Sequence, residues 1–228
     1  MCFSARASFI AAGALGAIGS ATVAQCREKK SLPFAMTPLF FGLQQLCEGI
    51  VWLGLSAAEP LTPLHTIAVY LFCGFALMFW PIWLPWSLYL IETRASRKRV
   101  LFWFVCFGAV MGILSFAAAL YFGITASEHV RHITYQLTCI SAHKQSSPWL
   151  YLFTALYAIP TVISFFVSTI PFTSTIGLIA AAALIFVQIS YHMAFASVWC
   201  FFAALISICF YGIQSGIFGK LYKKEGRR

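Results

Sequence analysis

Residues 174–219 contain no Asp, Glu, Lys or Arg, and this single run constrains the fold more than any other feature. An α-helix rises about 1.5 Å per residue, and the hydrocarbon core of a bilayer is about 30 Å thick. One straight helix over this run would therefore be about twice as long as a membrane crossing requires. Two helices separated by a break near residues 191–196 fit the run, so we predict a polytopic membrane protein.

The composition agrees with a membrane protein and excludes most soluble classes. The 228 residues are 61% hydrophobic and 9% charged, whereas soluble domains carry about 25% charged residues. The net charge of +9 therefore indicates membrane topology, and the sequence offers no basic soluble face suited to nucleic acid. The predicted partner is the lipid bilayer. The eight cysteines form no CxxC pair, which favours small core residues over a disulfide framework.

The hydropathy pattern predicts an all-α, seven-transmembrane-helix bundle that forms one domain over residues 1–228. The predicted spans cover residues 2–24, 33–55, 64–91, 100–126, 149–170, 175–194 and 197–219. In the third span, two prolines lie among three tryptophans, which predicts a kinked end inside an interfacial aromatic belt. These residues are Pro81 and Pro85, with Trp80, Trp83 and Trp86.

The Lys and Arg residues predict the orientation of the bundle. With the N-terminus outside, the inner segments hold twelve of them, five in a basic cytoplasmic tail at residues 220–228, and the outer segments hold three. This excess on one side predicts an N-out, C-in topology. The first span is expected to stay in the chain, because only Arg6 precedes its apolar stretch and a secretory signal needs a basic start.

The second span carries an acidic residue inside an apolar run. Gln44, Gln45, Glu48 and Trp52 recur at helical spacing, and Glu48 is expected about 10 Å below the outer end of its helix. An ionised carboxylate at that depth costs several kcal/mol unless it is paired. One interpretation is a functional carboxylate that lines an outward-facing pocket. The other is a protonated Glu48 whose hydrogen bonds hold neighbouring helices together.

Other polar or aromatic residues are predicted near the same side of the membrane. They are Tyr70 and His65 in the third span, Gln188 and His192 in the sixth, and Ser197, Trp199 and Cys200 in the seventh. Together with the residues around Glu48 they outline a hypothetical pocket for a small molecule, a lipid headgroup or an ion.

Residues 127–148 form the longest outer segment, and its pattern predicts an amphipathic helix on the membrane surface. Val130, Ile133, Leu137 and Ile140 give one apolar stripe, and His129, His132, Gln136, Cys139 and His143 lie on the other face. The spacings of His129 with His132 and of Cys139 with His143 suit two ligands on one side of a helix. Imidazole and thiolate are ligands for zinc or copper. The alternative is a solvated polar face without metal.

These motifs resemble an uncharacterised bacterial family of small multi-pass membrane proteins. The resemblance rests on the opening MCFS, on QQLCEGIVW at residues 44–52 and on SVWCFF at residues 197–202. It covers nearly the whole chain and implies a bacterial inner-membrane location, but no reaction.

Two functions are left open by the sequence. In a binding, sensing or transport protein, Glu48 would pair with a cation or carry a proton. In a metal-assisted hydrolase acting on a lipid-like substrate, Glu48 and His192, with His65 or the loop histidines, would hold a metal that activates water. Seven helices are also similar to rhodopsins and ceramidase-type hydrolases at the level of the fold. However, the last span has no lysine for a retinal Schiff base, and the chain has no aspartate to act as the acidic zinc ligand.

Overall fold

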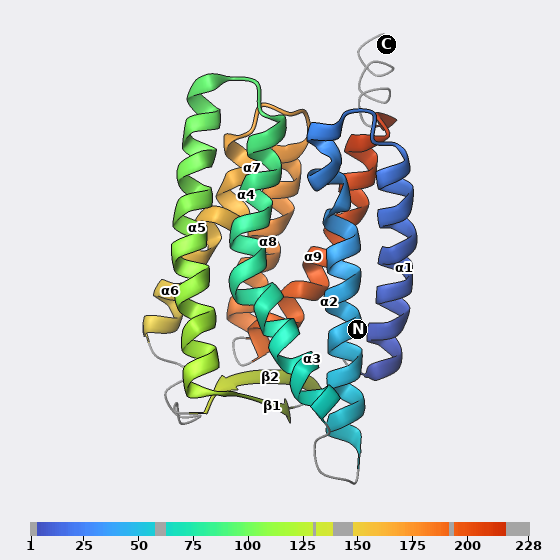
Figure 1. Cartoon of the computed structure of the whole chain (residues 1–228), viewed down its shortest axis with the longest axis vertical. Coiled ribbons are helices and arrows are strands. Elements are labelled where there is room, and N and C mark those ends of the chain that lie inside the picture. The colour runs from blue at the N-terminus through green and yellow to red at the C-terminus, as the bar shows by residue number, and fades with distance from the viewer. Residues whose placement is uncertain (1–3, 58–62, 130, 139–147, 192–193, 218–228) are drawn as a thin grey trace.

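The structure is a computed structural model that describes residues 4–57, 63–129, 131–138, 148–191 and 194–217. These parts of the chain are mostly helical, and the helices form a bundle with a two-stranded hairpin across one end (Figure 1). Five helices are long and apolar enough to cross a bilayer, namely Ala5–Ala24, Lys29–Ser56, Pro63–Ile91, Ala95–Phe122 and Thr173–Ser190. The chain is thus a helical membrane protein.

The elements follow one another along the bundle with short connections. α1 covers Ala5–Ala24, and a 3-10 turn at Lys29–Ser31 leads into α2, Leu32–Ser56. α3 (Pro63–Gly74), a π-helical turn (Phe75–Phe79) and α4 (Trp80–Ile91) form one continuous rod, followed by α5 (Ala95–Phe122). β1 (Ile124–His129) and β2 (His132–Leu137) form the hairpin. α6 (Pro148–Ala158) continues through a second π-helical turn (Ile159–Ile163) into α7 (Ser164–Val167), and α8 (Thr173–Ser190) precedes α9 (Phe195–Gln214).

Two helix ends show how the predicted spans compare with the structure. α8 ends at Ser190 and α9 begins at Phe195, which lies within the region where the uncharged run was predicted to break. α5 ends at Phe122, four residues before the predicted end at residue 126. Gly123 follows with φ 78°, a left-handed conformation that glycine adopts without strain and that commonly ends helices.

The hairpin replaces the amphipathic helix that was predicted for residues 127–148, as far as the structure describes that segment. β1 and β2 pair antiparallel, with His129 directly opposite His132. Arg131 in the turn has φ 61°, the left-handed conformation that two-residue hairpin turns favour. Ile133, Tyr135 and Leu137 alternate along β2, so the segment fits the two-residue period of a strand as well as a helical stripe.

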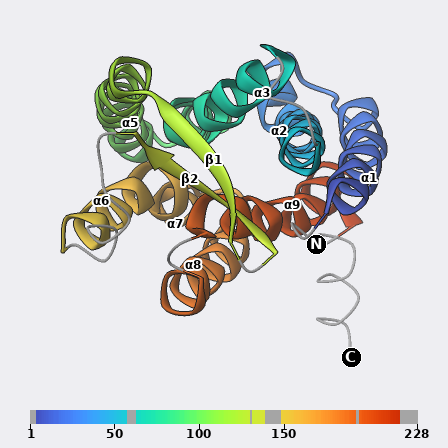
Figure 2. The same ribbon diagram turned by 90° about the horizontal axis from the view of Figure 1, so that it is seen from below.

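Packing against the bundle selects the strand. Seen along the bundle axis, the hairpin crosses the end of the helices diagonally from α5 towards α9 (Figure 2). Ile133 is fully buried and joins a core cluster with Trp52 and Val69. The ring of Tyr135 stacks on Phe72 with 4.5 Å between ring centroids. The hairpin thus covers the end of the bundle that lies beyond Glu48 on α2.

The prolines of the α3–α4 rod are accompanied by a change in helix type. The π-helical turn Phe75–Phe79 immediately precedes Trp80 and Pro81, and Pro81 has no N–H to continue a regular ladder. The hydroxyl of Tyr157, at the end of α6, donates to the carbonyl of Ala76 in this turn over 2.8 Å. Trp80 is only 2% exposed. The predicted interfacial aromatic belt therefore does not include Trp80, which belongs to the core.

Candidate functional site

The carboxyl group of Glu48 lies in the interior of the bundle, where α2 meets the start of α9. Glu48 is fully buried, and the hydroxyl of Ser197 donates a hydrogen bond to its Oε1. Ser197 is itself fully buried and lies in the first turn of α9, which begins at Phe195. The first turn of a helix carries unpaired N–H groups and the positive end of the helix dipole, so this position favours a negative charge.

The described core offers Glu48 no buried basic partner. Lys and Arg are absent from the buried residues of the described ranges, whereas Glu48 is completely enclosed. Removing an ionised carboxylate from water costs several kcal/mol unless a counter-charge or hydrogen bonds replace the water. The site is therefore suited to a carboxyl group that takes up a proton or a cation.

Gln44 lies one turn deeper on the same face of α2 and is held by an indole. Trp80 Nε1 donates to Gln44 Oε1 over 2.7 Å, and both side chains are buried. The ring of Trp80 is stacked on Phe41, with 3.8 Å between centroids. Because an indole N–H can only donate, this bond orients the amide and leaves its NH₂ group as the donor for other contacts.

Three buried donors around Glu48 make no hydrogen bond to any described residue. They are Gln45 Nε2, Trp52 Nε1 and Ser8 Oγ. Gln45 and Trp52 flank Glu48 on α2, and Ser8 on α1 is next to Phe9, whose ring packs against Gly49. A buried donor without a partner costs about 1–3 kcal/mol, so native proteins satisfy such groups with ordered water or a ligand. Ser8 was not singled out from the sequence, because one serine in an apolar helix gives no local signal.

His65 lies between this cluster and the outer end of α2. Its imidazole is 3% exposed and hydrogen-bonds to the backbone of Val51. A Cβ on Gly54 would lie 2.0 Å from His65 Nδ1, so the glycine makes room for the ring. Tyr70, one to two turns further along α3, is half-buried. His65 thus caps the apolar side of the site, against the α2 backbone.

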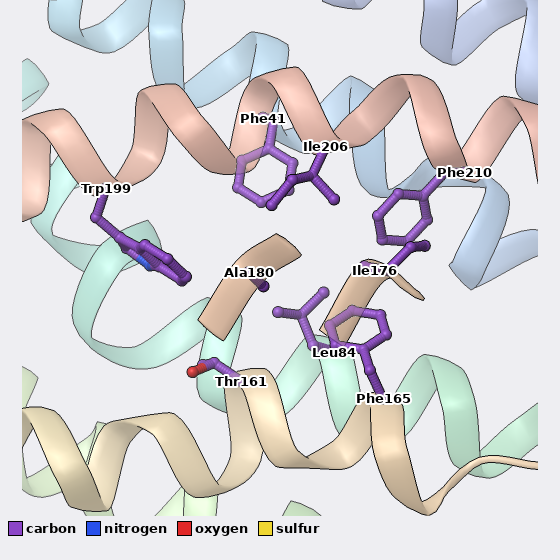
Figure 3. Close-up of a pocket in the computed structure, with 9 residues that line it drawn as sticks. All are labelled: Phe41, Leu84, Thr161, Phe165, Ile176, Ala180, Trp199, Ile206 and Phe210. Carbon is purple, nitrogen blue, oxygen red and sulfur yellow. The ribbon is translucent and has the colours of Figure 1, made fainter. Parts of the chain in front are cut away.

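Two other predicted pocket residues belong to different places in the bundle. Gln188 on α8 accepts a hydrogen bond from Thr154 Oγ1 over 3.2 Å and so links α6 to α8. Trp199 points into a cavity of about 30 Å³ in which Thr161 is the polar lining residue (Figure 3). The remaining lining is apolar and comes from α2, α4, α7, α8 and α9. A space of this size holds about two waters, which is too little for an organic ligand.

The predicted metal ligands are only partly described. His129 and His132 are cross-strand neighbours, but His129 is exposed and His132 is buried with its ring edge against Tyr191 at 5.0 Å. Burial, and then the positive charges of the N-terminus and of His129, lower the pKa of His132. Cys139, His143 and His192, and the side chain of Cys200, lie outside the described residues. Within the described ranges, no three His, Cys, Asp or Glu side chains are grouped closely enough to hold a metal ion.

Comparison with known proteins places the chain in a family. The model of DUF6629, a family of unknown function, matches residues 1–217, and the chain belongs to this family. This confirms the resemblance to an uncharacterised family that the sequence motifs indicate. Neither a curated protein nor a solved structure matches the chain significantly.

Proposed function

We propose that this member of the DUF6629 family is a seven-span protein of the bacterial inner membrane that binds a small cation, or exchanges a proton, at Glu48. Besides the five helices that meet the length criterion, two apolar helical segments run lengthwise in the bundle (Figure 1). These are α6–α7 with its π-helical turn, Pro148–Val167, and α9, Phe195–Gln214. They would be the fifth and seventh spans.

The distribution of charge supports an N-out, C-in orientation. The end formed by the α1–α2 and α4–α5 connections carries seven of the described basic residues: Arg27, Lys29, Lys30, Arg94, Arg97, Lys98 and Arg99. The hairpin end carries two, Arg6 and Arg131. Because basic connections are retained on the cytoplasmic side, the hairpin end would face outward. The ligand would then reach Glu48 from the outer side.

The observation that carries the proposal is a fully buried carboxylate without a buried cation in the described core. Its Ser197 partner is neutral, so the ionised state requires a positive charge from elsewhere. The buried donors of Gln45 and Trp52 favour a ligand that also presents oxygen acceptors. A hydrated cation, or a small molecule with both an ammonium group and an oxygen, meets these requirements. Binding, sensing and transport all begin with this step.

The metal-assisted hydrolase that the sequence left open depends on His192 or on the loop residues Cys139 and His143, which lie outside the described residues. His65 is directed to the α2 backbone at Val51. The cation or proton site is therefore the function that the described geometry supports best.

The test is the thermal stability of detergent-purified protein in sodium, potassium and choline salts and across a pH series. A ligand that binds only the folded state stabilises it by about 2.7 kcal/mol at 100 times its dissociation constant. We expect the wild type to respond to one cation or to pH, and Glu48→Gln to fold but lose that response. Glu128→Gln, which changes an exposed glutamate of β1, is the matched control and should behave as wild type.

Ser197→Ala provides a second arm of this test. It keeps the carboxylate but removes the hydroxyl that donates to it. We expect the response to persist with a shifted midpoint, because the charged form of Glu48 loses a hydrogen bond. A Glu48→Gln variant that keeps the full cation and pH response would contradict the proposal and leave Glu48 as a packing residue.

A further inference from the structure

A groove of about 350 Å³ opens at the end of the bundle opposite the hairpin. It lies between the α1–α2 connection, the end of α4, the α7–α8 connection and the end of α9, which meet at this end of the molecule (Figure 1). Its volume is within the range of about 300–1,000 Å³ that small-molecule sites occupy. The Glu48 site does not contribute to its lining.

The groove has two chemically different sides. Phe34, Ile91 and Ile213 contribute an apolar wall, and Arg27 and Lys30 contribute a basic rim. Lys30 is already paired, since its Nζ lies 2.9 Å from Glu28 Oε2. Arg27 is exposed and has no ion pair with any described residue. The guanidinium of Arg27 is therefore the rim charge that an incoming anion would meet.

Hydrogen bonds fix the polar part of the wall. Ser31 Oγ donates to the carbonyl of Glu28 over 2.8 Å and accepts a bond from Gln214 Nε2 over 3.3 Å. This joins the start of α2 to the end of α9 beneath the rim. The groove is thus built by two helix ends held together, and does not depend on one surface loop.

The position of the groove selects the kind of anion. Its apolar wall comes from the first turn of α2, the last turn of α4 and the last turn of α9, so it lies where these helices leave the hydrocarbon layer. A free inorganic anion would contact the rim alone and leave the wall exposed to water. A phospholipid would place its phosphate at the guanidinium and its glycerol and first methylenes against the wall.

We infer that this groove binds the headgroup of an anionic phospholipid from the leaflet at the basic end of the bundle, with Arg27 contacting the phosphate. In the orientation proposed above this is the cytoplasmic leaflet, whose anionic surface attracts basic segments. The inference concerns a different site from Glu48 and does not depend on what binds there.

The experiment measures lipid binding to the full-length protein in a neutral detergent by native mass spectrometry. Phosphatidylglycerol, phosphatidylcholine and inorganic phosphate are the probes, with Arg27→Gln as the test variant. Arg99→Gln is the matched control, because Arg99 is also exposed at the same end but lies outside the groove. Thermal unfolding of both variants checks that they fold as the wild type does.

We expect phosphatidylglycerol to bind in preference to phosphatidylcholine, and Arg27→Gln to weaken its binding about fivefold, the effect of one basic residue at an anionic surface. Arg99→Gln should retain wild-type binding. Equal losses in the two variants would overturn the assignment in favour of general attraction to a basic surface. Displacement of the lipid by millimolar inorganic phosphate would overturn the lipid assignment and indicate a site for the free ion.

Discussion

The indole Nε1 of Trp80 donates a 2.7 Å hydrogen bond to Oε1 of Gln44, and this bond ties the α3–α4 rod to α2 one turn from Glu48. Trp80 is the first residue after the π-helical turn Phe75–Phe79. A π-helical turn rotates the residues that follow it relative to a regular helix, so it contributes to the direction of the indole. The irregularity of this rod is thereby connected to the geometry of the candidate site.

Trp80→Phe should destabilise the protein by about 1–3 kcal/mol, because it leaves a buried acceptor of Gln44 without this donor. The free energy of unfolding in mixed detergent and denaturant measures the effect. Trp103→Phe is the control, since Trp103 is 63% exposed on α5 and should change little. Equal stability of the two variants would show that the indole acts only as an apolar ring.

Gly54→Ala should be strongly destabilising, because a Cβ at this position would lie 2.0 Å from His65 Nδ1. Displacing a buried ring in a packed region costs about 1–3 kcal/mol. Gly13→Ala on α1 is the matched control: no atom lies within 4 Å of its ideal Cβ. It should be neutral or stabilise the helix by up to about 1 kcal/mol. Thermal unfolding of the two variants side by side decides, and a harmless Gly54→Ala would mean that His65 moves freely.

The helices were accessible from the sequence because a membrane leaves few alternatives. Backbone polar groups must be satisfied within each spanning segment, so a long apolar run in a helical protein predicts a helix. The burial of Glu48 follows from the same reasoning, since intramembrane acids face the bundle interior. Both predictions use only local hydropathy and a property of the solvent.

The hairpin and the site contacts were not accessible in this way. The segment around Ile133 and Tyr135 fits both periods, and its contacts with Trp52 and Phe72 favour the strand. The bond between Ser197 and Glu48 joins residues 149 positions apart. No local pattern encodes such a pairing, because it depends on how the helices pack. The sequence therefore indicated which residue was unusual, but not what surrounds it.

The proposed orientation predicts which end of the bundle is reached from outside the cell. Glu128 in β1 and Lys29 before α2 are both exposed and lie at opposite ends. In intact spheroplasts, a membrane-impermeant maleimide should label Glu128→Cys above the wild-type background and should not label Lys29→Cys. Both should be labelled after the membrane is permeabilised. Labelling of Lys29→Cys alone in intact cells would reverse the orientation and place the Glu48 site nearer the cytoplasmic side.

Glu92 forms a second buried carboxylate cluster, at the basic end of the bundle just after α4. It is 3% exposed, and its Oε1 accepts bonds from the backbone N–H groups of Thr93 and Arg94, both over 2.9 Å. Thr169, in the connection before α8, donates its N–H and its hydroxyl to the same carboxylate, each over 2.7 Å. The cluster holds the α4–α5 turn against the α7–α8 connection.

This arrangement gives the protein a predictable sensitivity to acid. Burial alone raises the pKa of Glu92, but the hydrogen bonds from Arg94, Thr169 and Thr93 outweigh it and bring the pKa below the ordinary value of 4.5. A carboxyl group with a lowered folded-state pKa contributes stability above its unfolded pKa and loses it as the pH falls through the folded value. Glu92→Gln should therefore be less stable than wild type at about pH 7, and the difference should shrink as the pH falls below about 4. Unfolding free energies over this pH range measure it, with exposed Glu128→Gln as the control. A difference that does not change with pH would assign the loss to packing and not to the charge of Glu92.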